Sequence, residues 1–218
     1  MRASYSGTLF DAHDTSAIFG LPDLNGADYR LRIVFDPDAP GVDRSIGDFW
    51  DYASGGSSTG FASPIRAAHL TINGRTVSVP GRDAKSALAE VSGGIGDTPG
   101  FVSQGLTRQS IVGNIYDSKT IGTGVHGPAG SFVPDLDAAI PLTMLLPGGD
   151  VSGGATFSFG SCIYEAGECA ATLTDAFGNM TASSFEIAPI PGPLGLALLP
   201  SGLALLVLVA HRRSTTTA

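Results

Sequence analysis

Apolar and polar residues alternate along several short segments of the chain, and residues 28–35 show this most clearly. Tyr29, Leu31, Ile33 and Phe35 take every second position there, and most of the residues between them are charged. Side chains of a β-strand point to opposite faces in turn, so this period of two predicts a half-buried strand. The proline and glycine residues of 36–41 then end it.

Asn73 and Gly74 stand between two β-prone runs, 65–72 and 76–79. Both residue types tolerate the positive φ of a tight hairpin turn, so we expect a β-hairpin. Further strands are expected at 5–10, 109–116, 140–146, 155–164, 169–174 and 183–187. Residues 82–91 are expected to form the one helix of the chain before the C-terminal tail. Asp83 would cap this helix and Gly93 would end it.

Many short strands separated by turns indicate a mainly β fold. The 30 glycines and 14 prolines of the chain suit such turns, and no internal repeat is evident. We therefore expect a β-sandwich or jelly-roll-like domain over residues 1–188, followed by a single C-terminal transmembrane helix within 189–213.

The expected membrane segment is the uncharged stretch 194–210. Its seventeen residues would rise about 25 Å as a helix, against about 30 Å for the hydrocarbon core. Counting from Gly192 and letting Arg212 and Arg213 reach toward the headgroups closes this difference. The arginine pair should stay in the cytoplasm with the short tail 214–218, which leaves the β domain outside. A buried core helix is the less favoured alternative, because the stretch has no polar face.

The order of residues 188–213 (a proline-rich joint, an apolar stretch, an arginine pair) resembles the PEP-CTERM class of bacterial sorting signals, in its VPLPA-like variant. The joint carries Pro189 and Pro191, and the pair is Arg212 and Arg213. The resemblance implies that an exosortase-type sorting enzyme recognises these four residues. It also implies a place in the bacterial cell envelope, anchored in the membrane or released to the surface or matrix.

Proteins of this class begin with a signal peptide, whereas the residues after Met1 lack an apolar core of the kind that a signal peptide needs. We therefore expect the true start to lie upstream of Met1. Translation of the upstream DNA in frame checks this, and stop codons without an apolar segment would count against it.

The charge distribution disfavours polyanionic partners. The net charge is −8, and all acidic residues precede Pro189, so the first 188 residues carry 10 − 20 = −10. Lys and Arg neutralise nucleic-acid phosphates, and the sequence shows no run of them, so no nucleic acid is expected.

Cys162 and Cys169 flank an expected hairpin loop. Facing strands would bring the sulfurs into bonding range, and a disulfide closing so short a loop stabilises by about 2–3 kcal/mol. Such a bond needs an oxidising compartment, which agrees with export. The alternative is a pair of free thiols in a cytosolic protein.

Asp36, Asp38 and Asp43 supply hard oxygen atoms of the kind that Ca²⁺ prefers. Their spacing differs from an EF-hand, so a solvated acidic loop is favoured over a metal site, and neither a metal nor a cofactor is expected.

Phe49, Trp50 and Tyr52 lie close to these acids in the sequence. Such rings can stack on sugars, or they can plug a loop, and the plug is favoured. Two glycine motifs, 56–60 (G-x-S-x-G) and 122–127 (G-x-G-x-x-G), lack the strand and helix that a nucleophile or phosphate site requires, and both are expected to be loops.

These observations favour an exported cell-surface or extracellular-matrix protein that is not an enzyme. Its expected partners are the sorting enzyme, the membrane and an exopolysaccharide. Two alternatives stay open: a carbohydrate-binding module that uses Trp50, and a secreted hydrolase on a jelly-roll scaffold.

Overall fold

The computed structural model describes all residues except 58, 82–89, 99, 133–134, 146–147 and 191–218. The chain divides after Ala188, and the unit before that point is the β domain. Within the described residues it contains twelve strands and no helix, which confirms the mainly β prediction. The strands are β1 (Arg2–Asp14), β2 (Asp28–Phe35), β3 (Asp43–Gly47), β4 (Trp50–Gly56), β5 (Ile65–Ile72), β6 (Arg75–Pro80), β7 (Glu90–Thr98), β8 (Phe101–Val112), β9 (Ile115–His126), β10 (Ile140–Met144), β11 (Ser152–Glu165) and β12 (Glu168–Ala188).

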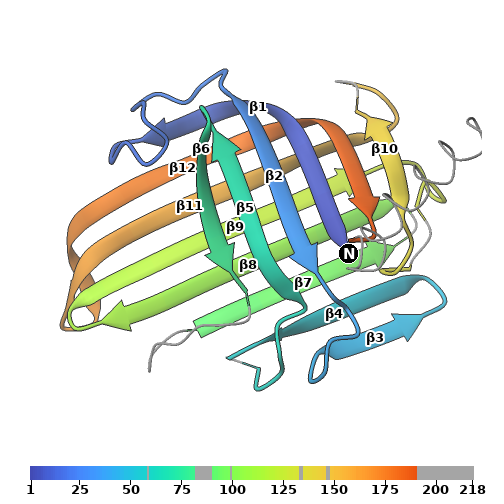
Figure 1. The fold of residues 1–218 in the computed structure, drawn as a ribbon, viewed down its shortest axis with the longest axis horizontal. Helices are drawn as coiled ribbons and strands as arrows, with labels where there is room; N and C mark the ends of the chain where they lie inside the picture. The colour runs from blue at the N-terminus through green and yellow to red at the C-terminus, as the bar shows by residue number, and fades with distance from the viewer. Residues whose placement is uncertain (58, 82–89, 99, 133–134, 146–147, 191–218) are drawn as a thin grey trace, which may run out of the picture. The chain divides into compact units, whose positions relative to one another are not determined.

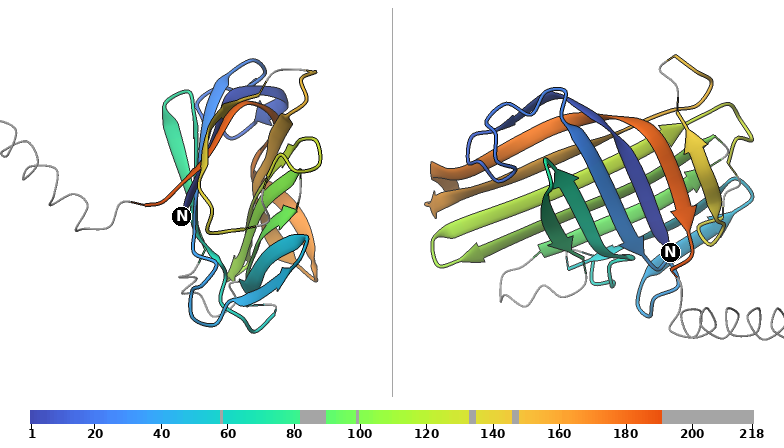
Figure 2. Two further views of the ribbon diagram at one scale, coloured as in Figure 1. Left: turned by 90° about the vertical axis from the view of Figure 1, so that its right-hand side faces the viewer. Right: turned by 45° about the horizontal axis from the view of Figure 1, so that its top comes forward.

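The strands form one antiparallel, nearly closed sheet (Figure 1). Its order is β3-β4-β7-β8-β9-β11-β12-β1-β2-β5-β6, with β10 added beside β12. Figure 2 shows this sheet doubled back, with β1, β2, β5 and β6 in one layer and β7, β8, β9 and β11 in the other. The long strand β12 belongs to both layers, since it pairs with β11 along its first part and lies between β1 and β10 at its end.

The apolar core lies between the two layers, because folding the sheet over removes one face from water. Its largest fully buried side chains include Tyr5, Phe19, Phe35, Phe159 and Phe185. Phe19 comes from the loop after β1, and its ring centroid lies 5.6 Å from that of Phe157 in β11. The buried carboxylate of Asp14 holds this loop by accepting hydrogen bonds from the backbone N–H groups of Ile18 and Phe19, at 2.9 and 2.5 Å.

The two strongest local patterns formed as predicted. In β2 the four alternating apolar side chains are buried and the polar ones face outward. Between β5 and β6, Asn73 and Gly74 have φ values of +50° and +74°, the positive values that a two-residue hairpin turn needs.

Three expected elements differ from the structure. Residues 109–116 are not one strand, because the chain turns at Gly113 (φ +64°) and Asn114 between β8 and β9. The segments 169–174 and 183–187 belong to the single strand β12. Of the expected helix 82–91, residues 82–89 lie outside the described part of the chain, and Glu90 and Val91 begin β7. The expected transmembrane helix also lies outside it.

A polar cluster inside the core joins the two layers. The Tyr5 hydroxyl of β1 donates to Oε1 of Gln104 in β8, and the Thr123 hydroxyl of β9 lies 3.0 Å from the same oxygen atom. Gln104 is 2 % exposed, so these groups satisfy one another where water does not reach them.

We expect the free energy of unfolding to fall in alkaline solution because of Tyr5 and Tyr29. Burial raises the pKa of both phenols above the usual 10. Above that pH the unfolded chain loses these protons first, so stability should fall by about 1.4 kcal/mol per tyrosine and pH unit. Urea unfolding at pH 9 to 11 measures this. If the free energy of unfolding of a Tyr5→Phe/Tyr29→Phe variant fell as steeply with pH as that of wild type, these two tyrosines would not be the cause.

Candidate functional site

Trp50 and Tyr52 project outward from β4 and are 48 % and 47 % exposed. The strand alternates, so the intervening Asp51 and the following Ala53 point inward. The indole lies against the backbone of Gly47, where an added Cβ would come within 2.6 Å of the ring. The indole N–H also donates to the Ser45 hydroxyl at 3.4 Å. The prediction that these rings plug a loop is therefore wrong, because strand alternation turns them to the surface.

The outward face next to these rings is rich in glycine. Directly paired residues share a face, so the register identifies the neighbours of Tyr52 across the strands. Starting from Tyr52, the row reads Gly96, Ser103, Gly124 and Gly154, and the next row, starting from Ser54, reads Gly94, Gly105, Gly122 and Thr156. A Cβ added at Gly105 would meet nothing within 4 Å, so the backbone there is open to contact from outside.

Aromatic and hydroxyl side chains border this glycine-rich strip. On one side the paired residues Phe101 and His126 stack with ring centroids 4.5 Å apart. On the other side the hydroxyl oxygen atoms of Thr107 and Thr120 lie 3.3 Å apart. We call Trp50, Tyr52 and the glycine-rich strip the aromatic platform. It offers rings for stacking and hydroxyls for hydrogen bonding on one face of the sheet.

The glycine motif 122–127, which we expected to be a loop, supplies part of this platform. Residues 122–126 lie in β9, within an extended ladder to β8 and β11. The motif 56–60 begins at the end of β4, and the Gly56 N–H bonds to the Phe61 carbonyl.

The opposite layer carries a cluster of basic side chains that lie apart in the sequence. Arg2, Arg30, Arg32 and His69 come from three strands but line two adjoining hollows on the outward face of β12, β1, β2, β5 and β6. The larger hollow has a volume of about 870 Å³. Only the pairing of β1, β2 and β5 brings these side chains together.

Two of the three suspected calcium ligands, Asp36 and Asp38, are bound by arginine. Arg44 binds the buried Asp51 with two hydrogen bonds, at 3.0 and 2.6 Å, and also contacts Asp38 at 2.5 Å. Asp36 pairs with Arg66. Hydrogen bonding to Asp51 raises the pKa of Arg44, so this guanidinium stays charged. In the part of the chain that the structure describes, no group of three His, Cys, Asp or Glu residues is arranged to hold a metal ion.

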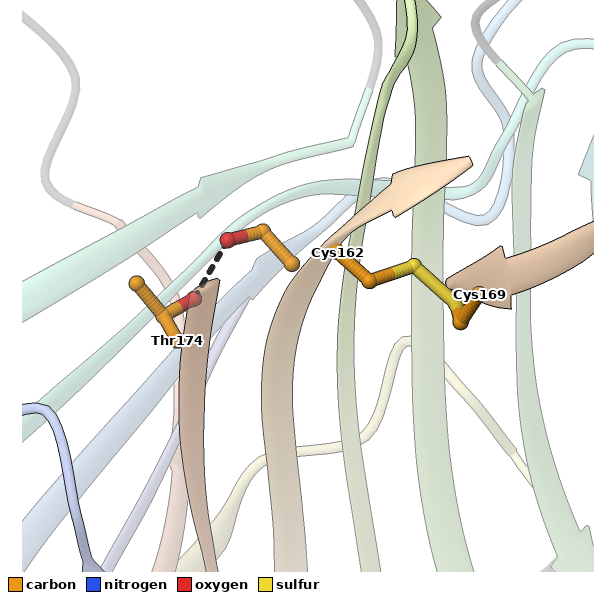
Figure 3. Close-up of a disulfide and its surroundings, with 4 residues drawn as sticks. Cys162, Cys169 and Thr174 are labelled. Atoms are coloured by element: carbon orange, nitrogen blue, oxygen red, sulfur yellow. Dashed lines mark hydrogen bonds between the residues drawn. A yellow bond between two sulfur atoms is a disulfide. The ribbon is translucent and has the colours of Figure 1, made fainter. Parts of the chain in front are cut away.

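Cys162 and Cys169 are bonded, as predicted, with their Cα atoms 5.6 Å apart (Figure 3). Ala166 and Gly167 make the turn between β11 and β12, both with positive φ. Beside the disulfide, the hydroxyls of Ser161 and Thr174 join the same two strands at 2.7 Å.

We expect replacement of both cysteines by serine to lower the free energy of unfolding by about 2–3 kcal/mol, the loop entropy that the bond removes from the unfolded chain. Urea denaturation measures the loss, and dithiothreitol should reproduce it in the wild type. A wild-type midpoint that dithiothreitol leaves unchanged would contradict this prediction.

Of the sorting residues, Pro189 follows directly on the end of β12 and is exposed, as is Ile190. Pro191, Arg212 and Arg213 lie outside the described residues. None of the described residues belongs to a helix of sufficient length and apolar character to span a membrane.

Comparison with known proteins assigns no family. No protein-family model, no curated protein and no solved structure matches the chain. The fold and its surfaces therefore define only a class: a mainly β domain with an intrachain disulfide, an aromatic platform on one layer and an arginine-lined hollow on the other.

Proposed function

We propose that the chain is an exported bacterial envelope protein, with its β domain outside the cytoplasmic membrane and its tail sorted by an exosortase-type enzyme. The observation that carries the proposal is the disulfide between Cys162 and Cys169. Such bonds persist in oxidising compartments and are rare in the cytosol. The order of the tail supports the same address, and the exposed Pro189 leaves the joint accessible to an enzyme. The scaffold of this proposal is β-sandwich-like, which the two layers of the sheet support.

Cell fractionation of the natural producer tests this address. The protein should appear in the outer or matrix fraction, and removal of residues 189–218 should change its fraction. A Pro189→Ala/Pro191→Ala variant should lose processing, which mass spectrometry of the C-terminus detects. The control is Pro128→Ala/Pro141→Ala, which alters two exposed prolines of the β domain. Full-length protein in the cytoplasm with both thiols free to alkylation would overturn the proposal.

Carbohydrate binding is the second candidate function, and the exposure of Trp50 and Tyr52 favours it. Exposed rings beside glycine backbone and hydroxyls can stack on a sugar face while the hydroxyls bond to its edge. On this proposal the domain displays the aromatic platform to a surface or matrix polysaccharide and performs no catalysis.

A glycan array probed with the full chain tests this second function. Trp50→Ala should weaken binding at least tenfold, since aromatic anchors dominate such contacts. Phe10→Ala is the matched control, because Phe10 is equally exposed (48 %) and lies on β1, away from the platform. Unchanged binding in Trp50→Ala would show that the aromatic platform is not the glycan-binding site. Cleavage of the bound glycan would instead favour the hydrolase alternative.

A further inference from the structure

We propose that the arginine-lined hollow binds an acidic polysaccharide, with Arg30 and Arg32 taking the carboxylate groups of its sugars. The larger hollow, of about 870 Å³, and a smaller one of about 260 Å³ share Ser6, Arg30 and Arg32 in their linings. They therefore form one continuous depression, which we call the arginine groove. It lies on the layer of β1, β2, β5 and β6, which faces the viewer in Figure 1.

Strand register places the two arginines at the centre of the groove. Both lie on β2, two positions apart, so they share a face and are separated by about 7 Å. Arg30 pairs with Ser6 of β1 and Thr71 of β5. Arg32 pairs with Ser4 of β1 and His69 of β5. Hydroxyl groups therefore flank Arg30 on both sides, while a hydroxyl and an imidazole flank Arg32.

The flanking groups satisfy one another and leave the arginines free. Thr71 bonds to Thr76 at 2.8 Å, His69 to Ser78 at 2.8 Å, and Ser6 to Ser184 at 2.6 Å. Arg30 and Arg32 are exposed and make no ion pair or hydrogen bond with another described residue. Arg44 and Arg66 differ from this pair, because carboxylates hold both of them. Both guanidinium groups are thus free to form ion pairs with the anionic groups of a ligand.

The local charge contrasts with that of the whole chain. Arg2, Arg30 and Arg32 against Asp28 and Glu186 give the groove 3 − 2 = +1, whereas the full chain carries −8. Arg2 stands 3.9 Å from Glu186, so the unbalanced positive charge lies on the β2 pair. The local charge of the groove therefore favours an anion, although the chain as a whole is acidic.

The spacing of these groups favours a polysaccharide over a nucleic acid. Duplex DNA carries one phosphate charge per about 1.7 Å of its axis, and binding it takes many cations. The groove instead alternates two cations with hydroxyl-bearing side chains, and acidic residues lie at Asp28 and Glu186. A chain of uronic acid sugars has a matching pattern, with separated carboxylates and hydroxyls between them. The choice of a polysaccharide also rests on the proposed extracytoplasmic address.

Titration of the full chain with polygalacturonate tests the proposal. The matched probe is the same polymer with its carboxylates methyl-esterified, which keeps the sugars and removes the charge. Wild type should bind the acid form at least tenfold more tightly than the ester, and added salt should weaken that binding. Arg30→Gln/Arg32→Gln should lose at least tenfold in affinity for the acid form. Arg66→Gln/Arg75→Gln removes the same charge outside the groove and should bind as wild type does.

Each other result would overturn the inference. Equal binding of the acid and ester forms would show that the arginines do not contact the polysaccharide. Unchanged affinity in Arg30→Gln/Arg32→Gln would show the same. Loss in both double variants would mean attraction by net charge alone. Duplex DNA bound as tightly through the same arginines would replace the polysaccharide by a nucleic acid. These assays use purified protein, so their failure leaves the cellular address, tested by fractionation, unaffected.

Discussion

Replacing Arg44 by methionine is expected to lower the free energy of unfolding by about 3–5 kcal/mol, because it leaves a buried carboxylate without its partner. Asp51 is 1 % exposed, and Arg44 supplies two of its hydrogen bonds. Oδ2 of Asp51, which accepts one of these bonds, also accepts the backbone N–H of Leu136 at 2.9 Å. Arg44 also donates to the Asp137 carboxylate at 3.0 Å, so it joins the β3–β4 hairpin to residues 136–137 as well as neutralising a charge. Chemical denaturation followed by circular dichroism measures the loss.

Arg66→Met is the matched control, since the exposed Arg66 side chain pairs with Asp36. A pair of this kind contributes about 0–1 kcal/mol. The Arg44→Met/Asp51→Leu double variant removes both buried charges and should recover part of the loss. Equal effects of the Arg44 and Arg66 replacements would show that the Asp51 carboxylate is hydrated rather than buried.

Truncation of Phe185 to alanine is expected to cost about 3–5 kcal/mol of stability, through lost burial and the cavity left behind. Phe185 is fully buried where β12 lies between β1 and β10, and its ring centroid lies 5.0 Å from that of Tyr5. Its ring also meets Phe132 edge-on at 6.3 Å. Loss of this side chain weakens the packing at the point where the sheet folds over.

Phe177→Ala supplies the comparison within the same strand. Phe177 is 39 % exposed, so its truncation should cost about 1 kcal/mol or less. Thermal or urea unfolding of both variants measures the difference. A Phe185 variant no less stable than the Phe177 variant would place the centre of the core elsewhere.

Local patterns predicted the elements whose residues decide their own conformation. The alternation of β2 and the Asn73–Gly74 turn are properties of a few adjacent residues, and both formed as predicted. The pairing of Cys162 with Cys169 also follows from short spacing around one turn. The residue types of Trp50 and its aromatic neighbours identified them as candidates for binding. Their sequence did not predict that Trp50 and Tyr52 are exposed.

Strands β3, β4 and β7 gave no comparable signal. β7 carries Gly93, Gly94 and Gly96, and its pattern lacks the alternation of apolar residues that identifies a strand. Their conformation comes from ladder hydrogen bonds to β8 and to one another, which neighbours in sequence do not supply. The same reason explains why the motif 122–127 was expected to be a loop.

By itself, the sequence determined the β class, the best hairpin, the cysteine pair and the separate character of the last thirty residues. Each of these depends on residues close together in the chain, where side-chain period and turn chemistry act directly. Tertiary structure alone decided that Arg44 neutralises Asp51, that Trp50 faces outward, and that Arg30 meets Ser6 and Thr71. These outcomes depend on which strands pair and in what register. Register is set by burial of one face of the whole sheet, which no single segment specifies.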